Sequence, residues 1–176
     1  MGKLTFVLGG TRSGKSRYAI ELAKSCRKVA FIATCQVRDR EMRERVQKHR
    51  LERPPHWKTF EEPLEIADLI KKIHKSFQAG VLDCLTLLVS NYMLAGFKED
   101  EIRKKILQLL GAIKASRCSW TLISSDVGSG VVPPHRLARK FRDMAGMVNQ
   151  WVAGRSDRVI FMVAGLPLTI KGSKRG

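Results

Sequence analysis

The sequence has 176 residues, of which 44% are hydrophobic, and this combination excludes a disordered chain and indicates one globular domain with a substantial core. Neither an apolar run long enough to span a membrane nor a secretory signal segment is present, so we expect a cytoplasmic protein without a membrane partner. The formal charge of +17 favours anionic partners such as nucleotides, whereas nucleic acid is disfavoured because the basic residues are spread along the chain without interleaved aromatic side chains.

The first predicted element is a strand over residues 4–8, and a phosphate-binding loop follows it directly. The loop reads G-x-x-x-x-G-K-S, and a helix is predicted over residues 17–24. Glycines let the backbone N–H groups approach phosphate oxygens, and the helix adds the positive end of its dipole. In this pattern Lys15 reaches the β- and γ-phosphates and the Ser16 hydroxyl binds Mg²⁺. The sequence therefore predicts a nucleoside triphosphate site formed by Gly9, Gly10, Thr11, Arg12, Ser13, Gly14, Lys15 and Ser16.

Strands and helices alternate through the rest of the chain. Such an order is typical of an α/β fold with a largely parallel sheet flanked by helices on both faces. No composition break divides residues 1–176, so we expect a single domain. The predicted strands cover residues 28–33, 57–60, 81–83, 120–124 and 158–163, with an edge strand at 166–170. The predicted helices cover residues 39–52, 63–74 (apolar face Leu64, Ala67, Ile70, Ile73 and His74), 84–95 and 101–116, with a last helix that carries Leu137, Phe141, Ala145, Val148 and Val152 on one stripe.

Asp83 is the candidate for a second Mg²⁺ ligand. A phosphate-binding loop usually works with an Asp at the end of a nearby apolar strand, and Asp83 follows Val81 and Leu82 in this way. The alternative is that Asp83 caps the helix that follows it.

His49 is the candidate for a nucleophile. It lies in the predicted charged helix, where Arg45 and Arg53 stand four residues away on either side and Arg50 is adjacent. Cationic neighbours disfavour the imidazolium form, and a neutral imidazole beside phosphate-binding arginines could attack a phosphorus atom. The alternative is a solvated surface histidine without a catalytic role.

Over nearly its full length, the sequence resembles the bifunctional adenosylcobinamide kinase / adenosylcobinamide-phosphate guanylyltransferase family of cobalamin synthesis. Several of the matching motifs are specific to this family rather than to proteins with a phosphate-binding loop in general. The motifs are Gly9–Arg17, Ile32–Thr34, Glu41–Met42, Arg45–Val46, His49, Arg53–Pro54, Trp57–Thr59, Glu61, Asp83–Thr86, Ser90–Asn91, Val127–Pro133, Arg136, Arg139, Phe141–Asp143 and Asn149–Gln150.

The resemblance implies a RecA-like P-loop NTPase domain that assembles as a homotrimer and binds a corrinoid substrate, GTP, ATP and Mg²⁺. It implies phosphorylation of the aminopropanol hydroxyl of adenosylcobinamide, followed by transfer of GMP from GTP through a GMP-histidine intermediate to give adenosylcobinamide-GDP. His49 matches the family's guanylylated histidine, and Asp83–Thr86 looks like its Walker-B segment. The positions that match its nucleotide contacts are Gly9 to Ser16, Ala33, Thr34, Cys35, Arg50, Leu51, Glu52, Arg53, Glu61 and Asp83.

Two alternatives stay open from the sequence. One is a P-loop kinase of a small molecule that lacks guanylyl transfer, and the other is a basic nucleic-acid-binding P-loop ATPase. His49 separates the first alternative from the bifunctional enzyme, because only guanylyl transfer needs a nucleophile of this kind.

Overall fold

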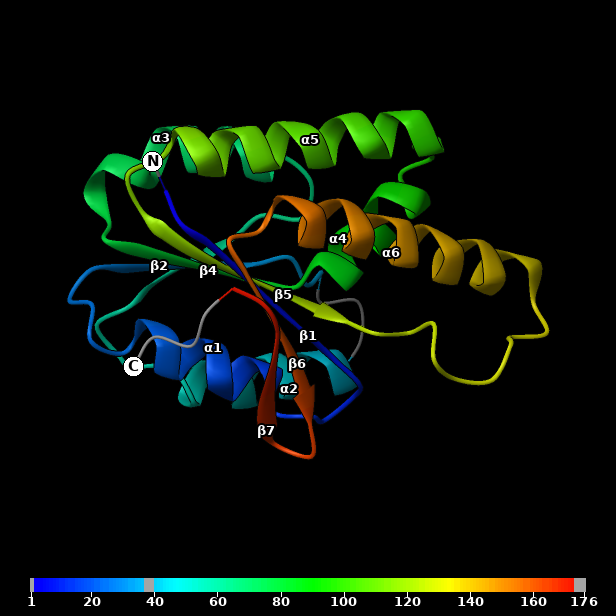
Figure 1. Ribbon diagram of the computed structural model, residues 1–176, viewed down its shortest axis with the longest axis horizontal. Coiled ribbons are helices and arrows are strands. Elements are labelled where there is room, and N and C mark those ends of the chain that lie inside the picture. Colours follow the sequence, from blue (N-terminus) through cyan, green and yellow to red (C-terminus); the bar gives the residue numbers. More distant parts are fainter. Residues whose placement is uncertain (1, 37–39, 173–176) are drawn as a thin grey trace.

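A twisted, mostly parallel sheet runs through the part of the chain that the computed structural model describes, residues 2–36 and 40–172 (Figure 1). Seven strands within these residues form the sheet, in the order β3-β2-β4-β5-β1-β6-β7. All neighbouring pairs are parallel except β6 and β7, which form an antiparallel hairpin at one edge. The strands are β1 (Leu4–Gly9), β2 (Val29–Ala33), β3 (Lys58–Glu61), β4 (Ala79–Asp83), β5 (Ser119–Ser125), β6 (Arg158–Val163) and β7 (Leu166–Lys171).

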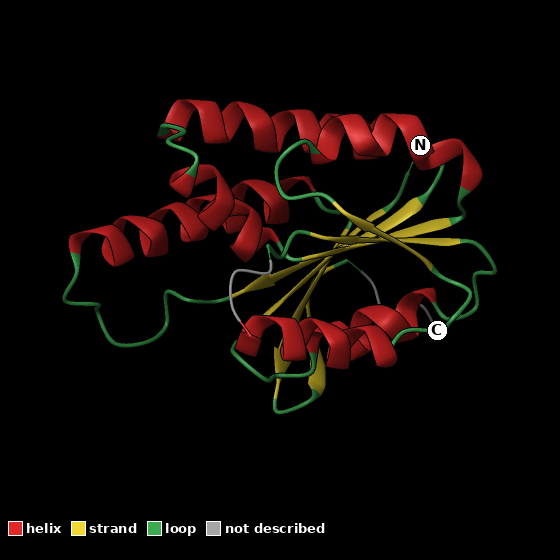
Figure 2. Cartoon of the chain, turned by 180° about the vertical axis from the view of Figure 1, so that it is seen from behind, coloured by secondary structure: helices red, strands yellow, loops and turns green. Residues whose placement is uncertain are grey.

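Helices cover both faces of the sheet. In Figures 1 and 2, α1 and α2 lie on one face, and the remaining α-helices lie on the other. The helices are α1 (Lys15–Ala23), α2 (Arg40–Leu51), α3 (Ile66–Ile73), α4 (Leu85–Leu94), α5 (Glu99–Ala115) and α6 (Arg136–Arg155), with a short 3₁₀ turn at His74–Ser76. The side chains of residues 40–42, 45, 48 and 49 are outside the described part of α2.

The apolar core fills the space on both sides of the central strands. All five residues of β2 are buried, as expected for a parallel strand that is covered on both faces. The larger cluster lies between the sheet and α3 to α6 and includes Phe6, Leu82 and Trp120. A smaller cluster packs α1 against β2 and β4. The predicted α/β fold with a largely parallel sheet is therefore confirmed.

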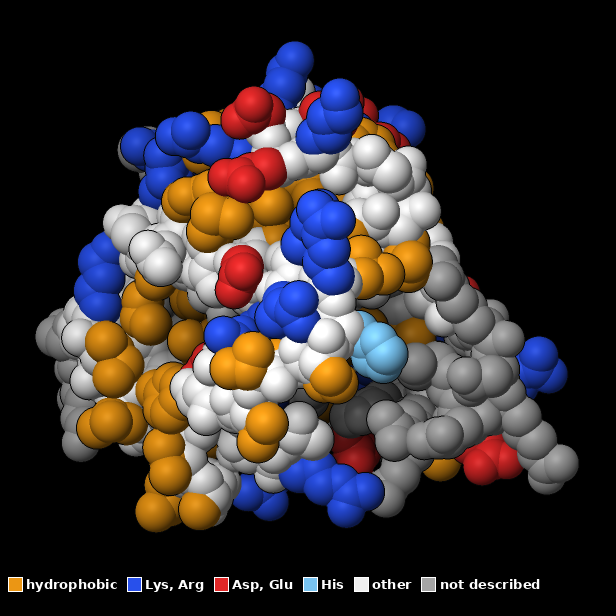
Figure 3. All heavy atoms as spheres, turned by 90° about the vertical axis from the view of Figure 1, so that its right-hand side faces the viewer, with side chains coloured by type: hydrophobic (Ala, Val, Ile, Leu, Met, Phe, Trp, Pro, Cys, Tyr) orange, Lys and Arg blue, Asp and Glu red, His pale blue; other side chains and the backbone are white. Residues whose placement is uncertain are grey.

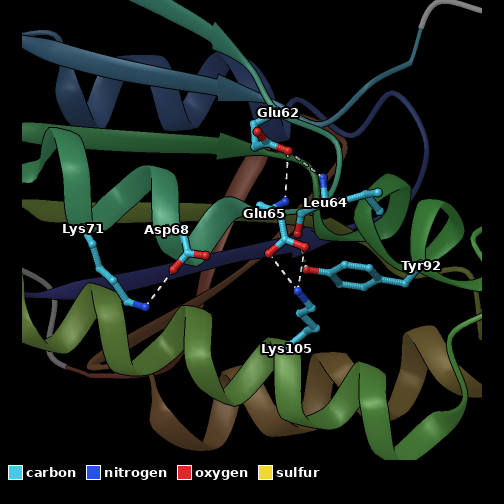
Figure 4. A network of polar contacts seen from close by, with 7 residues as sticks. All are labelled: Glu62, Leu64, Glu65, Asp68, Lys71, Tyr92 and Lys105. Carbon is cyan, nitrogen blue, oxygen red and sulfur yellow. Dashed lines mark hydrogen bonds and ion pairs between the residues drawn. The ribbon is translucent and has the colours of Figure 1, made fainter.

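A network of polar contacts fixes the turn between β3 and α3 (Figure 4). Glu62 Oε1 accepts hydrogen bonds from the backbone N–H groups of Leu64 and Glu65, at 3.0 and 2.9 Å. Lys105 on α5 donates to both carboxylate oxygens of Glu65, at 2.6 and 2.7 Å. The hydroxyl of Tyr92 on α4 donates to the Leu64 carbonyl at 2.8 Å, and burial raises its pKa. These contacts join β3, α3, α4 and α5.

Three helix predictions were wrong in detail. Leu64 lies in the turn before α3 and His74 lies in the 3₁₀ turn after it, so neither belongs to the helix face. The predicted loop before α5 is too long, because α5 begins at Glu99, and the Glu101 carboxylate accepts the Lys98 N–H at 2.8 Å in a capping arrangement. Leu137 lies in the first turn of α6 and is 61% exposed, whereas Ala145, Val148 and Val152 of the same stripe are buried and Phe141 is partly buried.

Among the described residues, the structure contains no helix that is both long and apolar enough to span a bilayer.

Gly80 provides a test of the packing between β4 and β5. A Cβ atom at this position would overlap the ring of Trp120, its parallel partner on β5. We expect Gly80→Ala to lower the free energy of unfolding by about 1–3 kcal/mol because the core is already full. Urea unfolding measures this change, with Gly154→Ala on α6 as the control. A Cβ at Gly154 meets nothing within 4 Å, and that substitution should be neutral or stabilising by up to about 1 kcal/mol. Equal effects of the two substitutions would contradict the packing described here.

Candidate active site

The phosphate-binding loop connects the end of β1 to the first turn of α1, as predicted. Gly14 adopts a left-handed conformation with φ of 90°, and a Cβ there would come within 3.3 Å of the Gly165 Cα. Within the described residues, the backbone N–H groups of Lys15, Ser16 and Arg17 have no hydrogen-bond partner, as at any helix start. The Ser13 hydroxyl is buried and also lacks a partner there. This loop therefore offers several unpaired donors to an anionic group, which fits a phosphate.

Lys15 lies across the loop that it belongs to. Its Nζ donates to the Gly10 carbonyl at 2.5 Å. Burial lowers the pKa of Lys15, while the neighbouring Cys84 and Asp83 oppose this shift. The ammonium group is thus held beside the loop and partly removed from water, where its attraction for a phosphate is stronger than at the surface.

Asp83 at the end of β4 faces the loop. Its Oδ2 accepts a hydrogen bond from the Ser16 hydroxyl at 2.8 Å, although β5 lies between β1 and β4 in the sheet. Asp83 does not cap the next helix: Cys84 is the N-cap of α4, and its Sγ accepts the Leu87 N–H at 3.5 Å. The alternative reading of Asp83 as a helix cap is therefore wrong. Ser16 and Asp83 together form an oxygen pair of the kind that Mg²⁺ prefers.

Cys84 is not a candidate nucleophile. Burial, followed by the nearby Asp83 carboxylate, raises the pKa of its thiol to about 12. The thiol therefore stays protonated at neutral pH, and its contact with the backbone of α4 is structural.

Thr34 and Asn91 hold the segment that carries Asp83. The Thr34 hydroxyl donates to the Cys84 carbonyl at 2.8 Å and accepts the Cys84 N–H at 2.9 Å. The Asn91 side chain on α4 donates to the carbonyls of Thr34 and Pro63, at 2.8 and 3.1 Å. The Thr34 hydroxyl and carbonyl are therefore used in bonds within the protein, and these bonds position the segment that carries Asp83. The predicted contact of Thr34 with a nucleotide stays a prediction.

Arg53 turns back toward the sheet after α2 has ended at Leu51. Its guanidinium lies 3.5 Å from the centre of the Phe31 ring on β2, and its Nη1 is 3.4 Å from the Thr59 hydroxyl. Burial lowers the pKa of Arg53, and the Asp83 carboxylate opposes that shift. The predicted placement of Arg53 one helical turn after His49 is therefore wrong, and the structure brings it to the Asp83 side of the site instead.

Arg50 and Glu61 lie at the carboxyl end of the sheet, where β3 ends. Arg50 Nη2 and Glu61 Oε1 are 2.6 Å apart, and this ion pair connects the end of α2 to β3. Both side chains are more than half exposed, so the pair contributes little to stability and can exchange for contacts with a ligand. Leu51 is 87% exposed beside it.

His49 lies in the last two turns of α2, next to Arg50, but its side chain is outside the described residues, as is that of Arg45. The predicted nucleophile therefore stays a prediction, as do the predicted roles of Ala33, Cys35, Glu52, Thr11 and Arg12.

Sequence reasoning missed the role of the hairpin between β6 and β7. The Gly165 N–H donates to the Ser13 carbonyl at 3.2 Å, and Gly165 has a φ of 83° that glycine adopts readily. The turn therefore supports the phosphate-binding loop from the side. Only a glycine after Ala164 signals the turn in the sequence, and nothing there indicates its contact with Ser13.

The candidate site lies at the carboxyl ends of the strands, and Figure 3 looks onto this end of the molecule. Lys and Arg side chains lie at separate places over the face, and hydrophobic side chains gather at its lower left. On the described part of this face, the basic side chains therefore do not form one continuous patch.

Comparison with known proteins gives a consistent result for nearly the full chain. Residues 5–170 match the family model described as cobinamide kinase / cobinamide phosphate guanyltransferase. The bifunctional adenosylcobalamin biosynthesis protein CobP of Pseudomonas aeruginosa is 42% identical over 169 residues, which cover 94% of this chain and 96% of the relative. The corresponding protein CobU of Escherichia coli is 37% identical over 180 residues, which cover 96% of this chain and 99% of the relative.

Solved structures share the fold at low sequence identity. The RadB recombinase superposes with a TM-score of 0.57 at 18% identity, over 91% of this chain and 74% of that one. A KaiC-like protein from Pyrococcus horikoshii gives a TM-score of 0.53 at 16% identity, over 91% of this chain and 70% of that one. The predicted RecA-like P-loop fold is therefore confirmed.

The contact between Ser16 and Asp83 predicts how activity depends on Mg²⁺. Asp83→Asn keeps the shape of the side chain but removes the negative charge, so the half-saturating Mg²⁺ concentration for GTP turnover should rise by about tenfold or more. A titration of activity with Mg²⁺ measures this. Asp68→Asn, on the surface of α3, is the matched control and should leave the titration unchanged. A wild-type titration curve for Asp83→Asn would remove Asp83 from the metal site.

Proposed function

Because the chain belongs to the cobinamide kinase / cobinamide phosphate guanyltransferase family, we propose that it catalyses both reactions on adenosylcobinamide. In the first, a nucleoside triphosphate phosphorylates the aminopropanol hydroxyl. In the second, GMP passes from GTP to the new phosphate and gives adenosylcobinamide-GDP. The observation that carries this proposal is the contact of Ser16 with Asp83 at the phosphate-binding loop, in a chain that matches bifunctional relatives over almost its whole length.

The kinase step needs positioning and charge neutralisation more than covalent chemistry. The substrate hydroxyl attacks the γ-phosphorus, the bond from that phosphorus to the bridging oxygen of the nucleoside diphosphate breaks, and the hydroxyl proton passes to solvent. Lys15 and the N–H groups that begin α1 would hold the β- and γ-phosphates. Ser16 and Asp83 would hold Mg²⁺, which when bound neutralises the charge that develops on the phosphate oxygens. Arg53, which lies against the Phe31 ring and interacts electrostatically with Asp83, adds a second cation near the site.

The guanylyl step needs a nucleophile, and we propose His49. A neutral imidazole nitrogen attacks the α-phosphorus of GTP, the bond to pyrophosphate breaks, and a phosphoramidate forms. A phosphate oxygen of adenosylcobinamide phosphate then attacks the same phosphorus and releases the histidine. Arg50 lies next to His49 in sequence, and Arg53 and Glu61 lie at the same edge of the sheet, which supports their assignment as nucleotide contacts.

We further infer that the chain works as a cytoplasmic homotrimer. The support for the assembly is the family resemblance together with the apolar side chains that the edge strand β7 exposes. Leu166, Leu168 and Ile170 are 71%, 56% and 62% exposed, and an edge strand with apolar side chains of this kind is normally covered.

Lys15 tests the nucleotide site. Lys15→Ala removes a charge-assisted contact to the β- and γ-phosphates that is worth roughly 1.5–3 kcal/mol, so GTP affinity and both activities should fall by about 10- to 150-fold together. Equilibrium binding and turnover assays measure the loss. Lys24→Ala, which is just beyond the end of α1 and pairs with Glu21, is the control. If Lys15→Ala behaves like Lys24→Ala, the loop is not the triphosphate site.

His49 tests the two-reaction proposal. With α-labelled GTP and Mg²⁺, wild-type protein should form a covalent GMP adduct that acid breaks and alkali spares, because the bond is P–N. The yield should decline as the pH is lowered, because the protonated imidazole cannot attack. His49→Ala should abolish the adduct and guanylyl transfer while it largely spares the kinase reaction. His56→Ala, in the exposed turn before β3, is the matched control.

Two outcomes would contradict the assignment. An acid-stable adduct, or one that survives in His49→Ala, would mean that another residue is the nucleophile. Wild-type protein that forms no adduct but still phosphorylates adenosylcobinamide would favour the kinase without guanylyl transfer.

A further inference from the structure

A hollow of about 590 Å³ lies at the opposite end of the sheet from the phosphate-binding loop. It opens where β1 begins, beneath the last turns of α5 and beside the end of α6. We call it the N-terminal hollow, and its volume falls within the range of pockets that bind small molecules. Its position separates it from every residue assigned above to nucleotide binding.

The floor of the N-terminal hollow is apolar. Leu4 on β1 and Leu107, Leu110 and Ile113 on α5 contribute to it. Gly111 lies among them, and a Cβ atom there would meet nothing within 4 Å. A glycine in the middle of a helix is unfavourable for the helix itself, and here its missing side chain leaves an exposed part of the lining open. A second hollow of about 510 Å³ shares Gly111, so the open space continues along α5.

The rim of the hollow is basic. Lys3, Lys114 and Arg155 line it, and Asp157 is the one carboxylate among the lining residues. Asp157 is turned to the protein, because its Oδ2 accepts the Leu4 N–H at 2.7 Å. Among the described residues, neither Lys3 nor Lys114 forms an ion pair or a side-chain hydrogen bond. The ammonium groups are therefore available to a ligand.

The two helices that end here do not cancel this charge. The carbonyl ends of α5 and α6 carry partial negative charge, but several of these carbonyls already accept hydrogen bonds. The Ser116 hydroxyl donates to the Ile113 carbonyl at 2.7 Å. Lys171 of β7 donates to the carbonyls of Ala153 and Gly154, at 3.2 and 2.9 Å. Of the charged side chains that line the hollow, the ones without an ion pair or a side-chain hydrogen bond among the described residues are the cations Lys3 and Lys114.

We propose that the N-terminal hollow binds a small amphipathic anion, a molecule with an apolar ring or chain and one carboxylate, phosphate or sulfonate group. The apolar part would lie on the leucine and isoleucine floor, and the anionic group would contact Lys3 and Lys114. β1 connects the hollow to the phosphate-binding loop but separates the two by its whole length, so this ligand and a nucleotide bind at the same time. The proposal does not depend on the function proposed above.

The fluorescent probe 8-anilinonaphthalene-1-sulfonate has this chemistry and tests the site. With the full chain and saturating Mg²⁺ and GTP, we expect one probe molecule to bind with a dissociation constant on the order of 10 to 100 µM. In methyl NMR spectra, the probe should shift the signals of Leu107, Leu110 and Ile113. Shifts confined to Leu166, Leu168 and Ile170 of β7, or no saturable binding, would overturn the proposal.

Three variants locate the binding. Gly111→Leu fills the floor with a good helix former, and Lys114→Glu reverses a rim charge, so each should weaken probe binding by roughly tenfold. Lys140→Glu makes the same charge change near the start of α6, at the opposite end of that helix from Arg155, and should leave the affinity within about twofold of wild type. Equal affinities of wild type, Gly111→Leu and Lys114→Glu would place the probe elsewhere and overturn the proposal.

Discussion

The hydrogen bond between Ser16 and Asp83 is the contact on which the candidate active site depends. It joins the first turn of α1 to the end of β4 across the intervening β5, so it forms only if three parallel strands end at matching positions. The bonds of Thr34 to the Cys84 backbone and of Asn91 to the Thr34 carbonyl fix the segment that presents Asp83. The Gly165 turn fixes the loop from the other side. The fold thus holds both halves of the site before a ligand binds.

The same edge of the sheet can serve two reactions because different elements supply the groups that each one needs. The phosphate-binding loop and Asp83 suit transfer of a terminal phosphoryl group, which requires cations and positioned N–H groups. The last turn of α2 adds the proposed nucleophile His49 and Arg50, and Arg53 follows two residues after the helix ends. Because Arg53 approaches Phe31 and Asp83, the two groups of residues adjoin rather than form separate pockets.

The sequence was sufficient to predict the elements whose signals are local. Apolar runs predicted the strands, and the order of strand, glycine-rich loop and helix predicted the phosphate-binding site. Contacts between distant segments could not be predicted in the same way. Asp83 was identified from the sequence, but two roles stayed open for it. In the structure Cys84 caps the next helix, because its thiol accepts the Leu87 N–H, and Asp83 accepts the hydrogen bond of Ser16 instead. Arg53 was predicted to stand one helical turn after His49, but the helix ends two residues before it, and Pro54 signals a stop without indicating where the arginine side chain lies.

The central claim is that Ser16 and Asp83 bind one Mg²⁺ together with the phosphates of the nucleotide. Calorimetric titration of GTP into wild type, Ser16→Ala, Asp83→Asn and the double variant tests it most directly, with Mg²⁺ and again with EDTA. Two ligands of the same ion should be non-additive, with a coupling of about 1 kcal/mol or more that disappears in EDTA. Effects that add to within about 0.5 kcal/mol in Mg²⁺, or a coupling that is unchanged by EDTA, would contradict a shared metal site.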